Sequence, residues 1–427
     1  MTATATPAPT GKIGPQPWIT AAGTRAVIDA LTAKGTEVRF VGGCVRDALI
    51  KRPVKDIDIA TPDTPEKVMA LLQAAAIKAL PTGIEHGTVT AIADGRPFEI
   101  TTLRIDVETD GRRARVAYTD DWIADAARRD FTINTLSATP SGDVYDPFHA
   151  IDDLAHGRVF FVGVARQRVE EDLLRILRFF RIYADHGRPP ADAEALAACR
   201  ALAHRLPELS GERIRREMFR ILLAPNPADT VHLMQGERIL EHILPEAGGV
   251  GRLRMLSWLE STAIKVASVV PDAVRRLAAL LETDRAGAAG VAQRLRLSNA
   301  EKNRLARAMD SPGDFGLEMS GKARRRLFHR HGADAVRDWI LLAWAAERAL
   351  APRQKTERCD GWRDFLAAAD SWRAVDFPVR GLDALALGVA QGPALGGFLK
   401  SVEDWWEAED FLPGRDQCLA RLRELIG

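Results

Sequence analysis

Two acidic residues in a short apolar segment are the first candidates for chemistry in this sequence. Asp56 and Asp58 alternate with Ile57 and Ile59. In a strand, residues two apart share a face, so both carboxylates would point one way while the isoleucines pack behind them. Neighbouring carboxylates repel each other, and Mg²⁺, which prefers oxygen ligands, commonly stabilises such a pair beside a nucleotide. A solvent-facing acidic edge strand is the alternative.

A glycine pair precedes this acidic segment, between a predicted strand and a predicted helix. Gly42 and Gly43 would let backbone N–H groups approach an anion at the N-terminus of the helix, and Arg46 adds a positive charge beside it. The same residues could form only a tight strand-to-helix turn. Because Asp56 and Asp58 follow, the pattern favours a phosphate site.

Glu99 and Arg129 are further candidates for a phosphoryl-transfer site. Glu99 belongs to a predicted strand, and a carboxylate near the attacking hydroxyl could act as a base or as an additional metal ligand. An exposed strand glutamate would look the same. Arg129 follows Arg128, and a planar guanidinium group can bind two triphosphate oxygens at once. A solvated basic face is the alternative for this pair.

The segment 110–115 is predicted to be a mobile loop, because a glycine lies there within a cluster of charged residues. The candidate residues in this loop are Asp110, Arg112 and Arg113. For the two arginines in isolation, a solvated basic surface is the favoured interpretation.

The segment 168–184 is predicted to be an amphipathic helix. Its core stripe, about 100° wide on a helical wheel, consists of Val169, Leu173, Ile176, Leu177 and Phe180. Its polar side carries Glu171, Asp172, Arg175, Arg178 and, at the border, Arg181. A surface helix with ordinary ion pairs would look similar, but three arginines at a spacing of three exceed what one ion pair needs.

Asp172 and Arg175 could read a nucleotide base from this helix. The carboxylate of Asp172 can accept a hydrogen bond from the exocyclic amine of cytosine or adenine, and Arg175 can donate to an acceptor on the same edge. Uracil and guanine present a carbonyl where the carboxylate needs an amine. The helix could therefore select C and A without a nucleic-acid template.

These side chains need an α/β domain to position them. Strand-forming and helical runs alternate between residues 36 and 148, and the predicted strands are 37–41, 56–60, 88–92 and 97–103. Asp94 and Gly95 separate the last two strands. This dipeptide favours a two-residue hairpin, so these strands should be antiparallel neighbours in a small mixed sheet.

Beyond about residue 165 the strand signals nearly vanish, and windows such as 191–203 and 272–283 have a helical period. Ser298 with Glu301 forms a capping-box pattern. The predicted fold class is an α/β head followed by an all-α neck, body and tail. The predicted boundaries are a flexible tail at 1–16, the head at 17–155, the neck with the base-selecting helices at 156–225, and the helical body and tail at 226–427.

Composition limits the class of protein. A chain of 427 residues with 46% hydrophobic and 27% charged residues is typical of a globular protein with several domains. No run is long and apolar enough for a membrane span, and the first residues lack the features of a secretory signal. We therefore expect a cytoplasmic protein without a membrane partner. The four cysteines lack the spacing of a zinc site.

The net charge of +1 means that a nucleic-acid partner would require a local basic patch. The stretch 294–330 is a candidate, with ten lysines or arginines and four aspartates or glutamates. It could follow RNA phosphates with a salt-dependent affinity. Scattered arginines on an ordinary helical surface are the alternative. Trp405 and Trp406 could stack on RNA, although core packing is the commoner role.

Taken in order, the motifs resemble those of the bacterial class II tRNA nucleotidyltransferases, the CCA-adding enzymes, whose superfamily includes the poly(A) polymerases. Each motif alone is moderately specific for this family, and the complete set in this order and spacing is highly specific. The resemblance covers residues 42–181 and is weaker beyond. The matching segments are Gly-Gly-Cys-Val-Arg-Asp from Gly42, Asp-Ile-Asp-Ile-Ala-Thr from Asp56, Arg-Arg-Asp-Phe-Thr-Ile-Asn from Arg128, Asp-Pro-Phe from Asp146, and Glu-Asp-Leu-Leu-Arg-Ile-Leu-Arg-Phe-Phe-Arg from Glu171.

The resemblance implies template-independent addition of C, C and A to the 3′ end of tRNA, with CTP and ATP as donors and release of pyrophosphate. It implies that Asp56 and Asp58 hold a catalytic Mg²⁺. The loop with Asp110, Arg112 and Arg113 matches the flexible loop that the family needs for the adenosine step. The residues implied to contact the nucleotide are Gly43, Arg46, Arg129, Asp172, Arg175, Arg178 and Arg181.

Two alternatives stay open. Bacterial poly(A) polymerases share both catalytic motifs, although the segment 83–89 is more similar to the CCA-adding enzymes. A catalytically silent tRNA-binding protein would keep the basic helices without needing the aspartate pair. The pattern carries no signal for oligomeric state.

Overall fold

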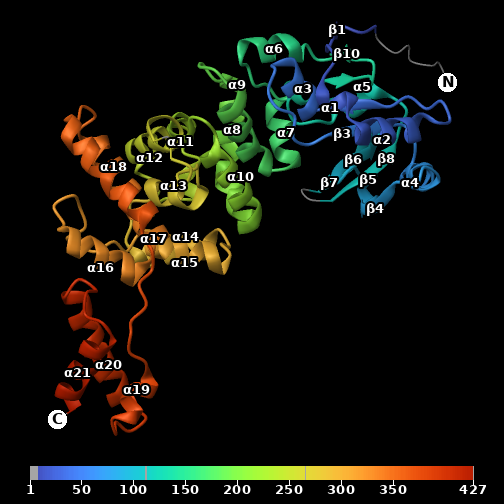
Figure 1. The fold of residues 1–427 in the computed structure, drawn as a ribbon. Helices are drawn as coiled ribbons and strands as arrows, with labels where there is room; N and C mark the ends of the chain where they lie inside the picture. Colours follow the sequence, from blue (N-terminus) through green and yellow to red (C-terminus); the bar gives the residue numbers. More distant parts are fainter. Residues whose placement is uncertain (1–7, 111–112, 265, 427) are drawn as a thin grey trace. The chain divides into compact units, whose positions relative to one another are not determined.

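Residue contacts divide the chain into two units, Met1–Pro245 and Glu246–Gly427. The computed structural model describes residues 8–110, 113–264 and 266–426. Figure 1 traces the chain from the mixed α/β elements of the first unit to the helices of the second. The predicted boundary at residue 225 falls inside the first unit, because helix α11 (Pro227–Gly236) packs against α8 (Leu174–His186) and α10 (Gly211–Leu223).

An eight-stranded mixed sheet forms the centre of the first unit, which confirms the predicted sheet type. Among the described strands, β3 and β6 are parallel and all other neighbours in the sheet are antiparallel. In spatial order the strands are β1 (Gly11–Lys12), β10 (Asp143–Tyr145), β9 (Ser137–Ala138), β2 (Arg39–Val41), β3 (Asp58–Thr61), β6 (Arg96–Thr102), β5 (Thr88–Ala93) and β4 (Lys78–Gly83).

The predicted hairpin between β5 and β6 is confirmed. Its two turn residues, Asp94 and Gly95, have φ values of 51° and 70°. Positive φ at both central positions belongs to a type I′ turn, whose twist matches that of the flanking strands. The hairpin fixes the register of β6, and the parallel pairing with β3 then places Glu99 opposite Asp58.

A separate two-stranded hairpin, β7 (Arg104–Asp110) and β8 (Arg113–Tyr118), occupies the segment predicted to be a mobile loop. Asp110 and Arg113 are register partners in this hairpin. Arg112 lies outside the described residues. The prediction of a loop was therefore wrong for Asp110 and Arg113, because the segments that contain Ile105 and Val116 favour strand pairing and extend it to these two residues.

Helices pack on the sheet and carry the chain beyond it. Helices α2 and α4 contact each other and β5, and the core beneath them includes Phe40, Ile59 and Phe98. Besides those already given, the α-helices of this unit are α1 (Pro17–Thr20), α2 (Ala22–Thr32), α3 (Gly43–Leu49), α4 (Pro65–Ala74), α5 (Trp122–Ala127), α6 (Ala150–His156), α7 (Ala165–Glu171) and α9 (Ala193–Leu202). Its 3₁₀ turns are η1 (Ile84–His86), η2 (Thr132–Asn134), η3 (Ala203–Glu208) and η4 (Leu240–His242).

The segment 168–184 forms parts of two helices where the sequence predicted one. Helix α7 ends at Glu171, Asp172 has an extended backbone, and α8 begins at Leu174. The carboxylate of Asp172 accepts hydrogen bonds from the backbone N–H of Leu174 and from Arg213, and such bonds compete with helical ones. The predicted core stripe is confirmed. Its buried members are Val169, Leu173, Ile176, Leu177 and Phe180.

The regular elements of the second unit are helices throughout its described residues, apart from an isolated β-bridge between Ala247 and Leu281. A π-helical turn, η5 (Leu259–Ala263), follows α12, and the capping box of Ser298 and Glu301 is present as predicted. None of the helices in the described ranges combines the length and apolar character of a membrane span. The α-helices are α12 (Val250–Trp258), α13 (Ala273–Leu280), α14 (Arg285–Arg294), α15 (Asn299–Ala308), α16 (Gly321–His331), α17 (Ala333–Leu350), α18 (Thr356–Ser371), α19 (Gly381–Ala386), α20 (Pro393–Ala408) and α21 (Arg415–Ile426).

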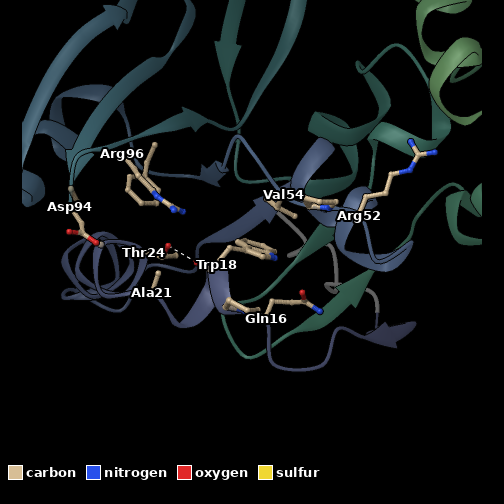
Figure 2. Close-up of a pocket in the computed structure, with 13 residues that line it drawn as sticks. Gln16, Trp18, Ala21, Thr24, Arg52, Val54, Asp94 and Arg96 are labelled. Carbon is tan, nitrogen blue, oxygen red and sulfur yellow. Dashed lines mark hydrogen bonds between the residues drawn. The ribbon is translucent and has the colours of Figure 1, made fainter. Parts of the chain in front are cut away.

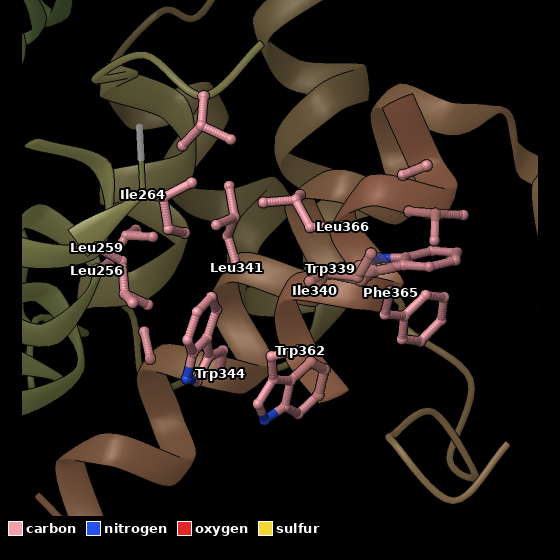
Figure 3. Packing of buried hydrophobic residues seen from close by; sticks show 14 of the residues in the cluster. Leu256, Leu259, Ile264, Trp339, Ile340, Leu341, Trp344, Trp362, Phe365 and Leu366 are labelled. Atoms are coloured by element: carbon pink, nitrogen blue, oxygen red, sulfur yellow. The ribbon is translucent and has the colours of Figure 1, made fainter. Parts of the chain in front are cut away.

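Aromatic side chains dominate the main apolar core of the second unit. Trp339, Trp344 and Phe365 from α17 and α18 pack in one cluster with Leu256 of α12 and Leu259 of η5 (Figure 3). A smaller core joins α20 and α21 around Trp406, which is 2% exposed. Trp405 packs against this smaller core. Core packing, the commoner of the two predicted roles, is therefore the role of Trp406.

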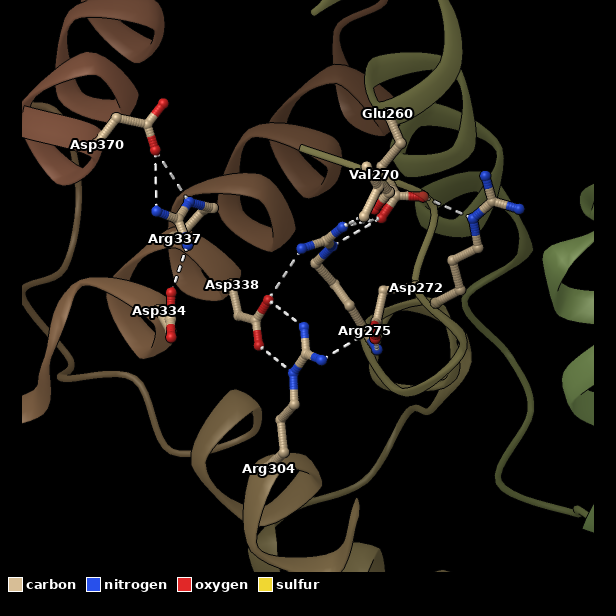
Figure 4. A network of polar contacts seen from close by, with 10 residues as sticks. Glu260, Val270, Asp272, Arg275, Arg304, Asp334, Arg337, Asp338 and Asp370 are labelled. Carbon is tan, nitrogen blue, oxygen red and sulfur yellow. Dashed lines mark hydrogen bonds and ion pairs between the residues drawn. The ribbon is translucent and has the colours of Figure 1, made fainter. Parts of the chain in front are cut away.

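A buried ionic network ties η5 to α13, α15 and α17 (Figure 4). The Glu260 carboxylate, with 0% side-chain exposure, accepts hydrogen bonds from Arg275 and Arg276 at 2.7 and 2.6 Å. Arg275 also donates to Asp338, which accepts two further bonds from Arg304. Each of these carboxylates therefore balances more than one cation away from water.

Five arginines of the stretch 294–330 lie against carboxylates from other segments of the second unit. Arg304 binds Asp338 and Asp272, and Arg330 binds Glu407 and Asp404. Arg294 binds Glu246, Arg325 binds Asp410, and Arg326 lies near Glu407. The predicted charge excess is therefore largely neutralised within the unit, and RNA binding by this stretch stays a prediction.

Candidate active site

The central carboxylates lie at the start of β3 and on β6. Asp58 is the first residue of β3 and is half-buried, with Ile57 and Ile59 buried on either side as predicted. Asp56 is exposed and precedes the strand, which begins two residues later than predicted. Glu99, also exposed, is the register partner of Asp58 on the parallel strand. Neighbours in register share a face of a sheet, so Asp58 and Glu99 lie side by side.

The electrostatic state of Asp58 reflects this arrangement. Burial raises the pKa of Asp58 to about 6, and the neighbouring carboxylates of Glu99 and Asp56 add to the rise while Arg129 opposes it. Like charges close together disfavour the ionised form. Three sequence-predicted carboxylates and one predicted arginine therefore share one electrostatic site.

The glycine turn lies beside this site. Gly42 has φ +69° and precedes α3, which begins at Gly43. A Cβ atom on Gly42 would lie 3.1 Å from Nη1 of Arg129, so the absence of a side chain lets the guanidinium approach the backbone. At Gly43 the nearest atom to an added Cβ would be Nη2 of Arg46, at an ordinary 3.7 Å.

Replacing Gly42 with alanine should therefore damage both stability and nucleotide binding. A side chain in this backbone region costs about 1–3 kcal/mol, and it would also displace Arg129. We expect a lower free energy of unfolding in urea and a higher KM for CTP. Gly236→Ala in α11 is the control, because the φ of Gly236 is not in the left-handed region and an added Cβ would meet no atom of the described residues within 4 Å. Equal effects of the two substitutions would contradict this interpretation.

Arg129 is held by a buried aspartate that sequence reasoning missed. Asp125 accepts from Nη2 of Arg129 at 3.1 Å, from Arg128 at 2.8 and 2.9 Å, and from the backbone N–H of Arg104 at the start of β7. Its pKa is lowered because the two guanidiniums outweigh the effect of burial. The signal was present in the sequence, since Asp125 lies one helical turn before the arginines.

A second network joins α3 to α8. Arg46 donates to Oδ1 of Asn134 at 2.7 Å, and Asn134 donates to Oδ1 of Asp130 at 3.0 Å. The other Asp130 oxygen pairs with Arg178 at 2.6 Å. Asp130 is buried, yet its pKa is lowered, because Arg178, Asn134 and Arg181 stabilise the charged form. The structure thus brings together three of the predicted nucleotide-contacting arginines.

Asp172 and Arg175, the predicted base readers, have separate partners in this structure. Both oxygens of Asp172 accept from Nη2 of Arg213 at 3.0 and 3.1 Å. Arg175 donates to the Glu171 carboxylate and to the carbonyl oxygen of Arg168. Arg181 pairs with Glu217 of α10 at 2.6 Å. The partners on α10 could not be found from the sequence, because they lie far along the chain.

His186, at the end of α8, lies among cations. Burial and the charges of Arg46, Arg52 and Arg181 lower the pKa of His186 to about 3. Its Nδ1 is 3.3 Å from Nη1 of Arg52. The neutral imidazole can accept this hydrogen bond, whereas the protonated ring would place another positive charge in the cluster.

This environment predicts a pH dependence of stability. The unfolded chain takes up a proton on His186 below about pH 6.5, whereas the folded protein resists protonation until about pH 3, so stability falls as the pH drops between these values. From pH 7 to pH 5 the parent should lose about 1–2 kcal/mol more unfolding free energy than His186→Gln. His156→Gln, at an exposed histidine of α6, is the control. Equal pH slopes in parent and His186→Gln would exclude this effect.

A pocket of about 390 Å³ lies elsewhere in the first unit (Figure 2). It is lined by α1, the start of α2, the segment after α3 and the β5–β6 turn, with Trp18 and Phe98 among its residues. None of the predicted catalytic or nucleotide-contacting residues lines it. We therefore locate the candidate active site by the carboxylates, the glycine turn and the arginines, and not by the size of a pocket.

Two family models match this chain. The model described as the poly A polymerase head domain matches residues 38–160, which include the carboxylates and the glycine turn. The model described as the probable RNA and SrmB- binding site of polymerase A matches residues 192–248. The second match contains the α10 partners Arg213 and Glu217, and the segment 161–191, with Asp172 and Arg175, lies between the two matches.

Curated relatives and solved structures extend the similarity. The mitochondrial CCA tRNA nucleotidyltransferase 1 of Danio rerio is 34% identical over 395 residues, covering 91% of this chain and 87% of the relative. The CCA-adding enzyme of Oceanobacillus iheyensis is 41% identical over 46% of this chain and 48% of its own. The Bacillus stearothermophilus CCA-adding enzyme, solved in complex with CTP, has the same fold, with a TM-score of 0.76, 23% identity and coverage of 95% and 97% of the two chains.

Proposed function

The chain belongs to the CCA tRNA nucleotidyltransferase family, and from that premise we propose that it adds C, C and A to the 3′ end of tRNA. CTP and ATP are the donors, and pyrophosphate is released. The observation that carries this function is the meeting of Asp56, Asp58, Glu99 and Arg129 beside the Gly42 turn. Neighbouring carboxylates repel one another and lower stability. A non-catalytic tRNA-binding protein would not need such a cluster of negative charge.

A divalent cation fits the carboxylates, and we propose Mg²⁺ held by Asp56 and Asp58. Burial and, to a smaller extent, the carboxylates of Glu99 and Asp56 raise the pKa of Asp58, and a bound cation would favour the ionised form of these carboxylates. No group of three or more potential ligands forms a metal site among the described residues. Mg²⁺ commonly uses only one or two carboxylates and completes its shell with water and substrate phosphates. When bound, the cation would neutralise phosphate charge and make the primer hydroxyl more acidic.

The chain's own residues would hold the triphosphate and the reacting proton. The backbone at Gly43 and the side chains of Arg46 and Arg129 supply N–H groups, and their bonds to Asn134 and Asp125 orient the guanidiniums before the nucleotide arrives. Arg178 and Arg181 extend this positive surface along α8. Glu99 is placed to accept a proton or to bind the cation beside Asp58.

Asp172 is proposed to select the base. Asp172→Asn replaces an acceptor pair by one acceptor and one donor, so the side chain could also serve the carbonyl of uracil or guanine. We expect the preference for CTP over UTP, measured as a ratio of kcat/KM, to fall about tenfold or more. Glu170→Gln on α7, at an exposed residue paired with Arg166, is the control. An unchanged ratio in Asp172→Asn would remove this residue from base selection.

Omission of single nucleotides tests the proposed activity. Purified protein and Mg²⁺ are incubated with tRNA that ends at the discriminator base, and CTP, ATP, UTP and GTP are offered separately and together. CTP alone should extend the tRNA, and ATP should add one residue only after CTP. Long tails from ATP alone on generic RNA would show a poly(A) polymerase, and no extension at all would favour the non-catalytic alternative.

The cytoplasmic location expected from the sequence stays a prediction. The relatives from Danio rerio and Homo sapiens are named as mitochondrial proteins. Fractionation of the source cells with an antibody against this chain would locate it.

A further inference from the structure

Arg168, on α7, connects the two halves of the candidate active site. Its side chain is only 11% exposed. Nη2 donates to the backbone carbonyl oxygens of Arg128 and Arg129, and Nη1 donates to Oε2 of Glu171 at 2.7 Å. Burial lowers the pKa of Arg168, and Arg175 adds to this effect. One nitrogen of this largely buried guanidinium donates to two main-chain carbonyl oxygens. Arg168 can therefore fix the backbone of Arg128 and Arg129.

On one side, Arg168 fixes the position of Arg175. The Glu171 carboxylate that accepts from Arg168 also accepts from Nη1 of Arg175. The same Arg175 nitrogen donates to the backbone oxygen of Arg168 at 2.8 Å. Both the side chain and the main chain of Arg168 therefore determine where the proposed base reader lies.

On the other side, Arg168 fixes the backbone of Arg129. The Arg129 guanidinium lies near enough to Asp58 to affect its pKa and donates to Asp125. Asp125 holds the side chains of Arg128 and Arg129, whereas Arg168 holds their carbonyl oxygens. The hydrogen bonds from Arg168 to its carbonyl oxygen and from its guanidinium to Asp125 together restrict the movement of Arg129.

We propose that Arg168 is a positioning residue that couples base reading at Arg175 to the arginine beside the catalytic carboxylates. This inference rests on the proposed function. A base that pairs with Asp172 and Arg175 leaves the Glu171–Arg168 contacts in place and Arg129 correctly positioned. A base that draws Arg175 away from Glu171 disturbs Arg168 and, through the two carbonyl oxygens, Arg129. Mispairing at the base thereby slows transfer at the phosphate.

A residue that only stabilises the fold would give a different kinetic result. Its loss lowers stability and the amount of active enzyme, but it changes the rates with CTP and UTP by the same factor. Loss of a coupling residue changes the ratio of those rates. The ratio of kcat/KM for CTP and UTP therefore separates the two roles.

Arg168→Lys is the test variant. A lysine keeps the charge but lacks the planar fork, so it cannot serve Glu171 and the two carbonyl oxygens together. We expect kcat/KM for CTP to fall about tenfold to a hundredfold, and that for UTP to fall much less, because misplacement of reacting groups penalises the correct substrate most. Arg166→Lys is the matched control, since Arg166 lies on the same helix, is 65% exposed and pairs with the exposed Glu170. It should behave as the parent.

Glu171→Gln and the double variant complete the experiment. If Arg168 and Glu171 act in one relay, the losses in CTP/UTP discrimination should be clearly less than multiplicative in the double variant. Circular dichroism and thermal unfolding confirm that each variant is folded. Discrimination at the parental level in folded Arg168→Lys, or fully multiplicative effects, would overturn the coupling. A parent that adds neither C nor A would instead overturn the proposed function.

Discussion

Asp58→Asn is expected to lower the rate of nucleotide addition to tRNA by about a thousandfold or more. The substitution keeps the shape of the side chain and removes the charge that would bind the cation. Asp58 is the carboxylate that is best placed for this role, because it begins β3 beside Glu99 and lies close enough to Arg129 for that charge to affect its pKa. Single-turnover extension of a tRNA transcript with saturating CTP and Mg²⁺ measures the effect.

The same variant should remain folded, which separates chemistry from stability. Since the folded state raises the pKa of Asp58 from about 4 to about 6, stability falls as the pH rises between these two values, and the full cost of the ionised carboxylate is present above about pH 6. Removal of the charge should therefore leave the free energy of unfolding unchanged or increase it by about 1–2 kcal/mol at pH 8 without metal. Asp143→Asn, at a carboxylate of β10 that pairs with Lys12, is the control. Parental activity in Asp58→Asn would refute the catalytic assignment.

Glu260→Ala is expected to destabilise the second unit by about 3–5 kcal/mol, because it leaves buried guanidiniums without their counter-charge. Arg275 and Arg276 have side-chain exposures of 4% and 1%, and both donate to Glu260. Arg275 keeps its bond to Asp338 in the variant, but Asp338 already serves Arg304. Urea unfolding followed by far-ultraviolet circular dichroism gives the change.

Glu318→Ala provides the comparison for this network. Glu318 is 91% exposed and pairs with Arg358 at 3.4 Å, so its removal should cost less than about 0.5 kcal/mol. A similar small effect of Glu260→Ala would show that the network of Figure 4 contributes little to stability.

Local signals predicted the parts of the fold that depend on neighbouring residues. The Asp94–Gly95 turn, the buried isoleucines around Asp58 and the apolar stripe of α7 and α8 all follow from spacing and turn chemistry. The mixed sheet and the change from strands to helices follow from the same periodicity. The family resemblance then supplied roles for residues that spacing alone left ambiguous, such as Arg129 and Arg178.

Features that depend on distant residues could not be predicted in this way. The helix break at Asp172 is stabilised by Arg213, which lies on another helix. The charges of the basic stretch 294–330 are neutralised by carboxylates such as Asp338 and Glu407, which only tertiary packing brings near. Arg168, which orients the site, carries no signal of its own, because an ion-paired surface helix has the same composition.

The 3′-end sequence of the product tests the central claim most directly. A tRNA transcript that ends at the discriminator base is incubated with the protein, Mg²⁺ and all four nucleotides, and the extended ends are sequenced. The carboxylates Asp56 and Asp58 and the proposed base readers Asp172 and Arg175 together predict ends that read cytidine, cytidine and adenosine, with no further addition. Ends of mixed sequence, adenosine homopolymers or transcripts left unextended would contradict it.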